Sequence, residues 1–184
     1  MSVVTLRDAT PDDAIEVTAV HNAAWRTTYS ALLPAEVVAE RTQMVPRLEL
    51  WRAWLGDPSR RTIVALLDGV ICGFSAFRPM PERLQDTEPL PDFDTYLEAL
   101  YVLQAAQKRG IGRALLAATA RALRDDGQHS LALHVLATNP ARDFYVRLGA
   151  EWLRDVPFLR RAGWDLSAYG WRDVTVLEGA PGAI

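Results

Sequence analysis

The feature that most limits how this chain can fold is a basic, glycine-containing stretch between an apolar segment and a helical one. Residues 107–113 read Gln-Lys-Arg-Gly-Ile-Gly-Arg and lie between the apolar residues 95–103 and a helical pattern over residues 110–126. Glycines let the backbone turn so that successive N–H groups converge on an anion, and a helix N-terminus adds free donors and partial positive charge. The lysine and two arginines add full charges. The stretch therefore predicts a phosphate-binding turn between a strand and a helix.

Two other phosphate-binding motifs do not fit this stretch. It lacks the Gly-Lys-Ser/Thr ending of a nucleoside-triphosphate loop, and Leu115 stands where the dinucleotide fingerprint has its third glycine. A bare Gly-x-Gly turn is also compatible with an ordinary strand-to-helix connection whose charges are solvated. The stretch alone leaves both interpretations open.

The N-terminal third is predicted to be mostly helical. Residues 3–7 form a strand, after which Thr10, a following proline and two early carboxylates indicate a helix that ends near Arg26. Pro34 and Pro46 are each placed as a first-turn proline of a shorter helix.

The remainder of the chain predicts strands with helices between them. Residues 62–67 and 70–77 form a hairpin, because Asp68-Gly69 satisfies the positive φ angles of a tight turn. Four prolines make residues 79–94 a long loop. The further predicted elements are strands at residues 95–103, 131–136, 151–156 and 169–177 and helices at residues 110–126 and 140–148, with Arg160, Arg161 and Trp164 in the loop between the last two strands.

Length and composition narrow the class of protein. The 184 residues are predicted to form one domain, 1–184, with a substantial core. A net charge of -3 gives no broad cationic surface, so we expect no nucleic-acid partner. No apolar run approaches the roughly 20 residues of a membrane-spanning helix, so no membrane partner is expected. With one cysteine, Cys72, and no signal-peptide pattern, the chain is expected to be cytoplasmic.

Two motifs in this setting resemble the GNAT superfamily of N-acetyltransferases. Gln107-x-x-Gly110-x-Gly112 matches its Gln/Arg-x-x-Gly-x-Gly/Ala acyl-CoA loop, and the expected strand, residues 97–102, precedes it. Residues 139–150 are similar to the family's Asn-x-x-Ala-x-x-Phe-Tyr-x-x-x-Gly-Phe, with Ala150 in place of the usual aromatic residue. The close resemblance covers residues 95–150. It implies an α/β (α+β) fold class, with a GNAT-like central mixed, mostly antiparallel sheet and helices on both faces.

The resemblance also implies acetyl-CoA as cosubstrate and a place for it. The pyrophosphate would sit on the amides of Arg109 to Arg113. The residues of this stretch implied to bind the cofactor are Gln107, Lys108, Arg109, Gly110, Ile111, Gly112 and Arg113. The pantetheine arm would pair with the backbone of Leu100, Tyr101 and Val102 like an added strand. Asn139 and Arg142 would contact the other side of the cofactor.

Acyl transfer from a thioester needs a deprotonated amine, a polarised carbonyl and a proton for the departing thiolate. The motif places Tyr145 near the sulfur as that acid, although a tyrosine on a helix stripe can also be a core residue. Glu98 is the candidate base, directly or through water, unless strand alternation directs it away from the cleft. Cys72 is interpreted as a packed strand residue, because its neighbours are apolar.

The acceptor site is less well defined by sequence. Trp25 and Tyr29 are candidate acceptor-binding residues, or they pack their helix on the sheet. The loop at residues 79–94 is acidic, which would attract a cationic amine or be solvated; its acidic residues are Glu82, Asp86, Glu88, Asp92 and Asp94. The three histidines, His21, His129 and His134, lack metal-ligand spacing, so no metal is expected.

The sequence therefore predicts direct transfer of an acetyl group from acetyl-CoA to a primary amine. A small molecule is the preferred acceptor, and a protein N-terminus or lysine is the alternative within the same chemistry. A non-catalytic acyl-CoA-binding or sensing module is the alternative of another class. A homodimer is common among the proteins that this chain resembles.

Overall fold

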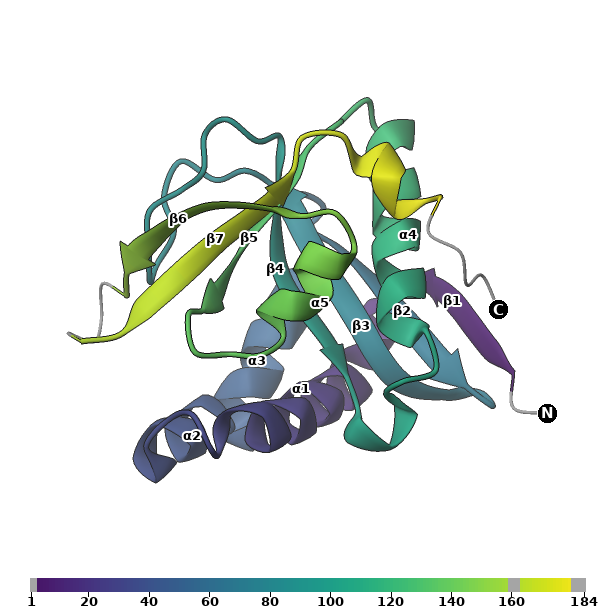
Figure 1. The fold of residues 1–184 in the computed structure, drawn as a ribbon. Helices are drawn as coiled ribbons and strands as arrows, with labels where there is room; N and C mark the ends of the chain where they lie inside the picture. The colour runs from purple at the N-terminus through teal and green to yellow at the C-terminus, as the bar shows by residue number, and fades with distance from the viewer. Residues whose placement is uncertain (1–2, 159–162, 180–184) are drawn as a thin grey trace.

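A seven-stranded sheet in the order β1-β2-β3-β4-β5-β7-β6 forms the centre of the molecule (Figure 1). The computed structural model describes residues 3–158 and 163–179. The strands are β1 (Val4–Asp8), β2 (Arg61–Leu67), β3 (Val70–Pro79), β4 (Thr95–Val102), β5 (Leu131–Leu136), β6 (Glu151–Pro157) and β7 (Asp165–Trp171). All neighbouring strands run antiparallel except β4 and β5, which are parallel. The predicted mixed, mostly antiparallel sheet is confirmed.

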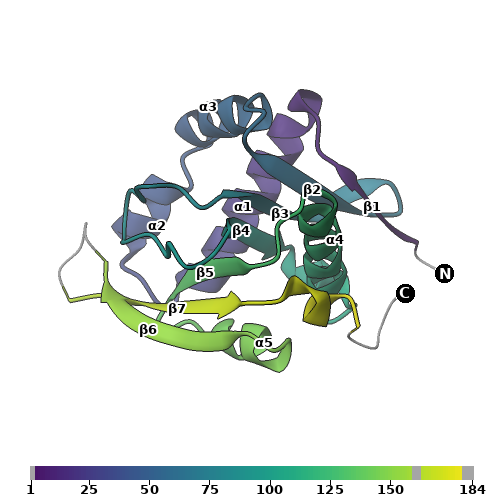
Figure 2. The ribbon, with the colours of Figure 1, turned by 90° about the horizontal axis from the view of Figure 1, so that it is seen from above.

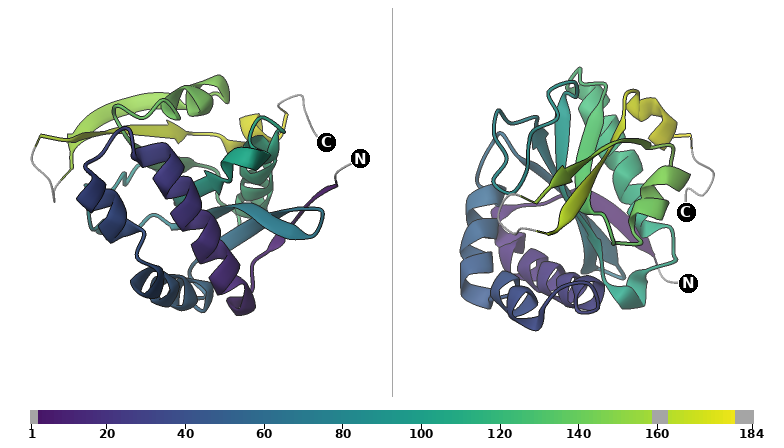
Figure 3. Two further views of the ribbon diagram at one scale, coloured as in Figure 1. Left: turned by 90° about the horizontal axis from the view of Figure 1, so that it is seen from below. Right: turned by 60° about the vertical axis from the view of Figure 1, so that its left-hand side comes forward.

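Helices cover both faces of the sheet (Figures 2 and 3). The helices are α1 (Ala14–Tyr29), α2 (Ala35–Arg41), α3 (Met44–Leu55), α4 (Ile111–Asp125) and α5 (Arg142–Arg147), with short 3-10 helices at Pro11–Asp13, Gln104–Ala106 and Val174–Leu177. Val17, Val20 and Trp51 of α1 and α3 pack with Phe74 on one face. The core on the other face includes Ile111, Leu115 and Leu116 of α4 together with Tyr145 of α5. The elements thus form three layers. None of the helices among the described residues is long and apolar enough to cross a membrane.

Local sequence signals predict the positions of most helices and strands, with one error near the C-terminus. The predicted hairpin is confirmed, because β2 and β3 meet at Asp68 and Gly69 with φ angles of 52° and 84°. The strand predicted at residues 169–177 is wrong in its second half. There β7 ends at Trp171, and Val174–Leu177 form a 3-10 helix. These residues are apolar because the 3-10 helix packs into the core beside α4, where Val174 and Leu177 are 0% and 2% exposed. Arg160 and Arg161 lie outside the described residues.

The sheet opens between β4 and β5. The two strands pair only through Thr95 with Leu131 and Tyr96 with Ala132, and then diverge (Figure 1). On the other edge of β4 the register with β3 shifts, so that Glu98 lies in a β-bulge between Leu97 and Ala99. A bulge bends a strand and increases its twist, which helps to turn β4 away from its neighbour. The β4 edge beyond Tyr96 therefore faces an opening instead of a strand.

Candidate active site

A cavity of about 900 Å³ occupies this opening. Its walls come from α1, β4, the turn before α4, β5 and the segment that leads into α5. The predicted site residues that line it are Tyr29, Glu98, Leu100, Tyr101, Val102, Gln107, Lys108, Gly110, Ile111, Gly112, Arg113, Asn139 and Tyr145. Arg109, Arg142 and Trp25 are not among its lining residues. The structure thus brings most of the predicted site together from segments that are far apart in the chain.

The glycine turn has the geometry of an anion site. Gly110 adopts the left-handed conformation, φ 78°, at the N-cap of α4, and Lys108 is also left-handed, φ 61°. Among the residues that the structure describes, no side chain caps this helix, so the N–H groups of its first turn remain available for a ligand. The side chain of Gln107 donates a 3.0 Å hydrogen bond to the carbonyl of Val102, which ties the turn to the open edge of β4.

The segment before α5 is also fixed by side chains. Asn139 is buried, and its Oδ1 accepts a 2.9 Å hydrogen bond from the N–H of Ala141, as a capping residue does. Arg142 donates a 2.6 Å hydrogen bond from Nη1 to the carbonyl of Ala137. Asn139 therefore starts the turn that leads into α5, and Arg142 braces it from outside the cavity.

Tyr145 places a buried phenol in the cavity wall. This residue is 8% exposed, and its ring meets Trp171 edge-on at 6.1 Å between centroids. Burial, with a smaller contribution from Tyr29, raises the pKa of the hydroxyl above its usual value near 10. The phenol consequently keeps its proton at neutral pH and can serve as a proton donor.

Tyr29 and Tyr101 connect α1 to the same cavity. The indole Nε1 of Trp25 donates a 2.9 Å hydrogen bond to the hydroxyl of Tyr101, and the rings of Trp25 and Tyr29 lie 4.2 Å apart. Burial raises the pKa of the Tyr29 hydroxyl, and the side chains of Tyr101 and Asn139 oppose this rise. Tyr29, Tyr101 and Tyr145 all line this cavity, so three tyrosine side chains gather there.

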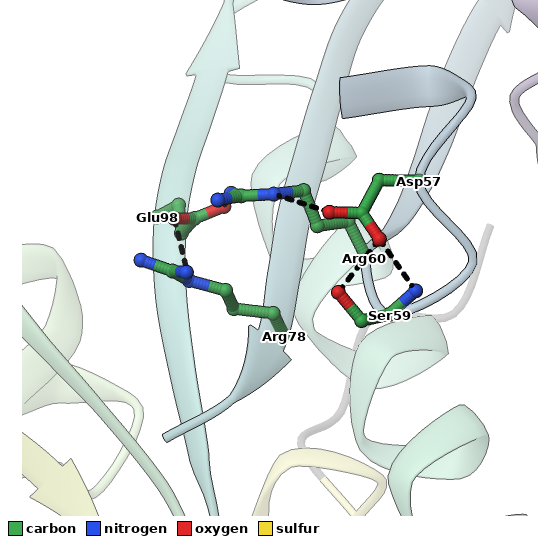
Figure 4. A network of polar contacts seen from close by, with 5 residues as sticks. All are labelled: Asp57, Ser59, Arg60, Arg78 and Glu98. Carbon is green, nitrogen blue, oxygen red and sulfur yellow. Dashed lines mark hydrogen bonds and ion pairs between the residues drawn. The ribbon is translucent and has the colours of Figure 1, made fainter. Parts of the chain in front are cut away.

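Glu98 lies in the cavity wall but is held by two arginines (Figure 4). Its Oε1 lies 2.8 Å from Nε of Arg78, and its Oε2 forms an ion pair with Arg60. Asp57 pairs with Arg60 from the other side at 3.3 Å. The Glu98 side chain is only 6% exposed. Both carboxylate oxygens are thus occupied by guanidinium groups, a surrounding that the sequence pattern could not indicate.

A second, smaller cavity of about 130 Å³ adjoins the first. The two share Tyr29, His134 and Val135 in their walls. Its lining residues are Trp25, Tyr29, Leu33, Val37, Arg41, Asp86, His134, Val135, Leu136, Phe158, Trp164 and Leu166. Trp25 and Tyr29 were expected from sequence, whereas Arg41 and His134 were missed, because no local motif marks them. Asp86 was named only as part of an acidic loop.

The acidic loop is largely engaged with the protein itself. Asp86 pairs with Arg41 at 3.5 Å, and Glu88 lies 3.7 Å from Arg154. Oδ2 of Asp94 accepts hydrogen bonds from the N–H groups of His129 and Ser130 and from the Ser130 hydroxyl. These contacts fasten the loop to neighbouring elements, so its charge is only partly available to a ligand.

Cys72 and His21 take structural positions. Cys72 is buried, its thiol donates to the carbonyl of Ala65 at 3.4 Å, and burial raises its pKa, so it packs in its strand as predicted. His21 is 6% exposed among Trp25, Trp51 and Tyr101. Within residues 3–158 and 163–179, no group of three or more His, Cys, Asp or Glu side chains is placed to hold a metal ion.

The fold and this cleft are those of an acyltransferase, and comparisons with known proteins agree. Residues 17–150 match the acetyltransferase (GNAT) family. The chain is 30% identical over 179 residues to the uncharacterized N-acetyltransferase YuaI of Bacillus subtilis (strain 168), covering 96% of this chain and 97% of that protein. The chain therefore belongs to the acetyltransferase (GNAT) family.

Solved structures share the fold. The PaiA N-acetyltransferase of Thermoplasma acidophilum, solved in complex with coenzyme A, is 16% identical and has a TM-score of 0.70, covering 92% of this chain and 99% of that one. The ribosomal-protein-alanine N-acetyltransferase of Brucella melitensis is 24% identical with a TM-score of 0.68, covering 91% and 98%. At these sequence identities the similarity shows a shared fold and says nothing about the substrate.

Proposed function

We propose that this protein transfers an acetyl group directly from acetyl-CoA to the primary amine of a small molecule. One observation carries the proposal: a single cavity joins the uncapped N-terminus of α4, the unpaired edge of β4 and the buried hydroxyl of Tyr145. These three features match an anionic pyrophosphate, an amide-containing arm and a thiolate leaving group. The coenzyme A complex of the Thermoplasma acidophilum relative supports the choice of donor.

The donor is proposed to follow the cavity from α4 to Tyr145. Its pyrophosphate lies on the N–H groups of residues 109–113, with the charges of Lys108 and Arg113 beside them. The pantetheine amides pair with the backbone of residues 100–102, which has no strand partner on the side of β5. Asn139 lines the opposite wall. The pyrophosphate and the pantetheine amides thereby each find complementary groups of this chain.

Tyr145 is proposed to protonate the leaving sulfur. The amine nitrogen forms a bond to the acetyl carbonyl carbon while the C–S bond breaks, and the electron pair of that bond goes to sulfur. The Tyr145 hydroxyl supplies the proton that yields CoA thiol, and the proton of the attacking amine leaves to solvent or a base. The place of Tyr145 in the wall of the donor cavity supports this role.

Glu98 is proposed to hold the bulge of β4 in place and not to accept the proton of the amine directly. Each oxygen of its carboxylate is already paired with a guanidinium group, that of Arg60 or that of Arg78. This pairing anchors the bulge of β4, and the bulge contributes to the opening in which the donor lies. The amine proton would then reach a base only through water.

The second cavity supports a small acceptor. At about 130 Å³ it is comparable to engineered cavities of about 150 Å³ that hold one benzene molecule. It meets the donor cavity at Tyr29, His134 and Val135, so an acceptor lying in it can extend its amine toward the thioester. The name of the Brucella melitensis relative keeps a protein N-terminus as the competing acceptor.

The test is amine-dependent release of CoA from acetyl-CoA, followed with a thiol-trapping dye. Amino acids, polyamines, aminoglycosides and short peptides are compared for the native protein and for Tyr145→Phe. Release that depends on a small amine and falls in the variant supports the proposal. Tight binding of acetyl-CoA without release by any amine would instead indicate a binding or sensing module.

A further inference from the structure

One end of the second cavity is charged. Arg41, at the end of α2, and Asp86, in the loop between β3 and β4, both line it. Nη2 of Arg41 lies 3.5 Å from Oδ2 of Asp86, and the two side chains are 25% and 26% exposed. Charge-assisted hydrogen bonds are usually 2.7–2.9 Å long, so this pair is loose. A loose pair in a cavity wall leaves guanidinium donors for an anion.

The surroundings of this pair carry an excess of positive charge. Arg47 donates a 3.0 Å hydrogen bond to the carbonyl of Arg41, and Arg26 donates at 3.2 Å to the carbonyl of Thr42. Within the described part of the chain, neither Arg26 nor Arg47 forms an ion pair with a carboxylate. Three guanidinium groups thus surround the end of α2, and Asp86 is paired with one of them. Arg47 is partly buried, whereas Arg26 is exposed. A partly buried cation without a counterion is costly, so an anion is favoured beside Arg41 and Arg47.

The rest of the cavity is apolar and aromatic. Trp25, Phe158 and Trp164 supply rings, and Leu33 and Leu166 supply aliphatic surface. With a volume of about 130 Å³, the space accepts a group no larger than about one phenyl ring. The wall therefore selects one small apolar group next to the charged end.

We propose that the acceptor is an amine that also carries a carboxylate and one small apolar or aromatic group, and that Arg41 binds this carboxylate. The inference rests on the proposed function, because it assigns the acceptor of that reaction. A guanidinium offers two parallel N–H donors that match the two oxygens of a carboxylate. Asp86 holds Arg41 in the wall, and the apolar group occupies the aromatic part of the cavity. The amine points to the donor cavity across Tyr29 and His134.

The experiment compares ligands that differ only in the carboxylate. Leucine, leucinamide and 3-methylbutylamine share an amine and an aliphatic group, and phenylalanine, phenylalaninamide and phenethylamine form a second series. CoA release gives kcat/KM for each. Since these amines differ in pKa, binding of N-acetyl-leucine and N-acetyl-leucinamide is measured as well, in the presence of CoA, by the fluorescence of the tryptophans that line the cavity. In both measurements we expect the carboxylate to be preferred roughly 10- to 100-fold, the value of a hydrogen-bonded charge.

Two variants separate the opposite charges of the pair. Arg41→Gln removes the guanidinium, and we expect the preference for the carboxylate to disappear. Asp86→Asn is the matched control, because it removes the opposing charge from the same ion pair, retains the Arg41 guanidinium and keeps a side-chain oxygen that can accept a hydrogen bond from it. It should retain the preference or strengthen it. Unchanged acetyl-CoA binding and an unchanged unfolding midpoint show that each variant is folded.

The outcomes distinguish this inference from the proposed function. Robust CoA release without a preference for the carboxylate, in turnover or binding, overturns the inference and leaves the proposed function standing. A preference for diamines that is lost in Asp86→Asn also overturns it and makes the acceptor cationic. Binding of N-acetyl-leucine that depends on Arg41, with no turnover of any amine, supports the carboxylate site while the proposed enzymatic function fails.

Discussion

The indole Nε1 of Trp25 donates a 2.9 Å hydrogen bond to the hydroxyl of Tyr101, and this contact joins α1 to the open strand β4. The two residues are 76 positions apart in the chain. Trp25 lines the smaller cavity and Tyr101 lines the larger one. The hydrogen bond therefore lies at the partition between the proposed acceptor and donor sites.

Trp25→Phe should weaken this partition. The variant leaves the hydroxyl of Tyr101 without its indole donor, which we expect to lower the free energy of unfolding by about 1 kcal/mol. KM for the acceptor should rise, whereas the Kd of acetyl-CoA should change little. Denaturant unfolding and steady-state kinetics measure both effects. Trp152→Phe is the control, because Trp152 is 58% exposed and its 3.2 Å hydrogen bond to Asp155 lies at the surface; an equal loss there would contradict the interpretation.

Glu98→Gln separates a positioning role from a catalytic one. Removing the charge leaves Arg60 and Arg78 without their shared carboxylate, and we expect the free energy of unfolding to fall by about 3 kcal/mol. Asp8→Asn, in the exposed pair with Arg61 at 3.0 Å, should cost less than about 1 kcal/mol. The folded Glu98→Gln protein should keep the shape of its pH–rate profile. Loss of the acidic limb of that profile would make Glu98 the proton acceptor.

Tyr145→Phe should lower kcat and leave donor binding intact. General-acid catalysis contributes roughly 100- to 10,000-fold, so we expect kcat to fall by at least about 100-fold, with the Kd of acetyl-CoA unchanged within about twofold. Because burial raises the pKa of this hydroxyl, its proton is retained as the pH rises, and kcat should show no loss from this group up to about pH 10. Tyr169→Phe, in the same core but away from the cavity, is the control.

His21 makes the fold sensitive to acid. Both ring nitrogens are buried and have no hydrogen-bond partner in the described part of the chain. Burial, followed by the charges of Arg47 and Arg41, lowers the pKa of the imidazole from 6.5 to about 3. Below about pH 6.5 the unfolded chain takes up a proton that the folded protein does not bind until about pH 3. Stability is therefore fully present above pH 6.5 and is lost as the pH falls, by about 1.4 kcal/mol per unit. His21→Phe should reduce this slope in urea unfolding, whereas the same change at the exposed His129 should not.

The half of the site proposed for the donor could be predicted because contiguous residues build it. The turn at residues 107–113, the strand before it and the turn at Asn139 each have their own glycine, proline or capping signal, and the helix and strand patterns place them in order. The predicted lining residues of the larger cavity come mainly from these segments.

The half proposed for the acceptor depends on contacts between distant segments. Arg41 and Asp86 are 45 residues apart, and the partners of Glu98 come from the segment before β2 and from β3. No local pattern specifies which arginine meets which carboxylate, because many pairings satisfy the same charges. The bulge at Glu98 was equally hidden, since it depends on the register between β3 and β4. Contacts between distant segments also explain the error at residues 174–177. Their apolar residues are buried beside α4 in a 3-10 helix, and the resulting pattern resembles that of a strand.

Gly110→Ala tests whether the turn before α4 acts on the donor or only on the fold. An alanine at φ 78° is strained, so we expect the free energy of unfolding to fall by about 1–2 kcal/mol. Gly127, φ 72°, follows the other end of α4 and has open space where the β-carbon of an alanine would lie, so Gly127→Ala imposes similar strain away from the cavity. Both variants should lose similar stability. Only Gly110→Ala should weaken acetyl-CoA binding, by roughly tenfold or more, because it displaces the N–H groups that we propose to face the pyrophosphate. Isothermal titration with acetyl-CoA measures the difference, and equal affinities in the two variants would mean that the turn does not hold the donor.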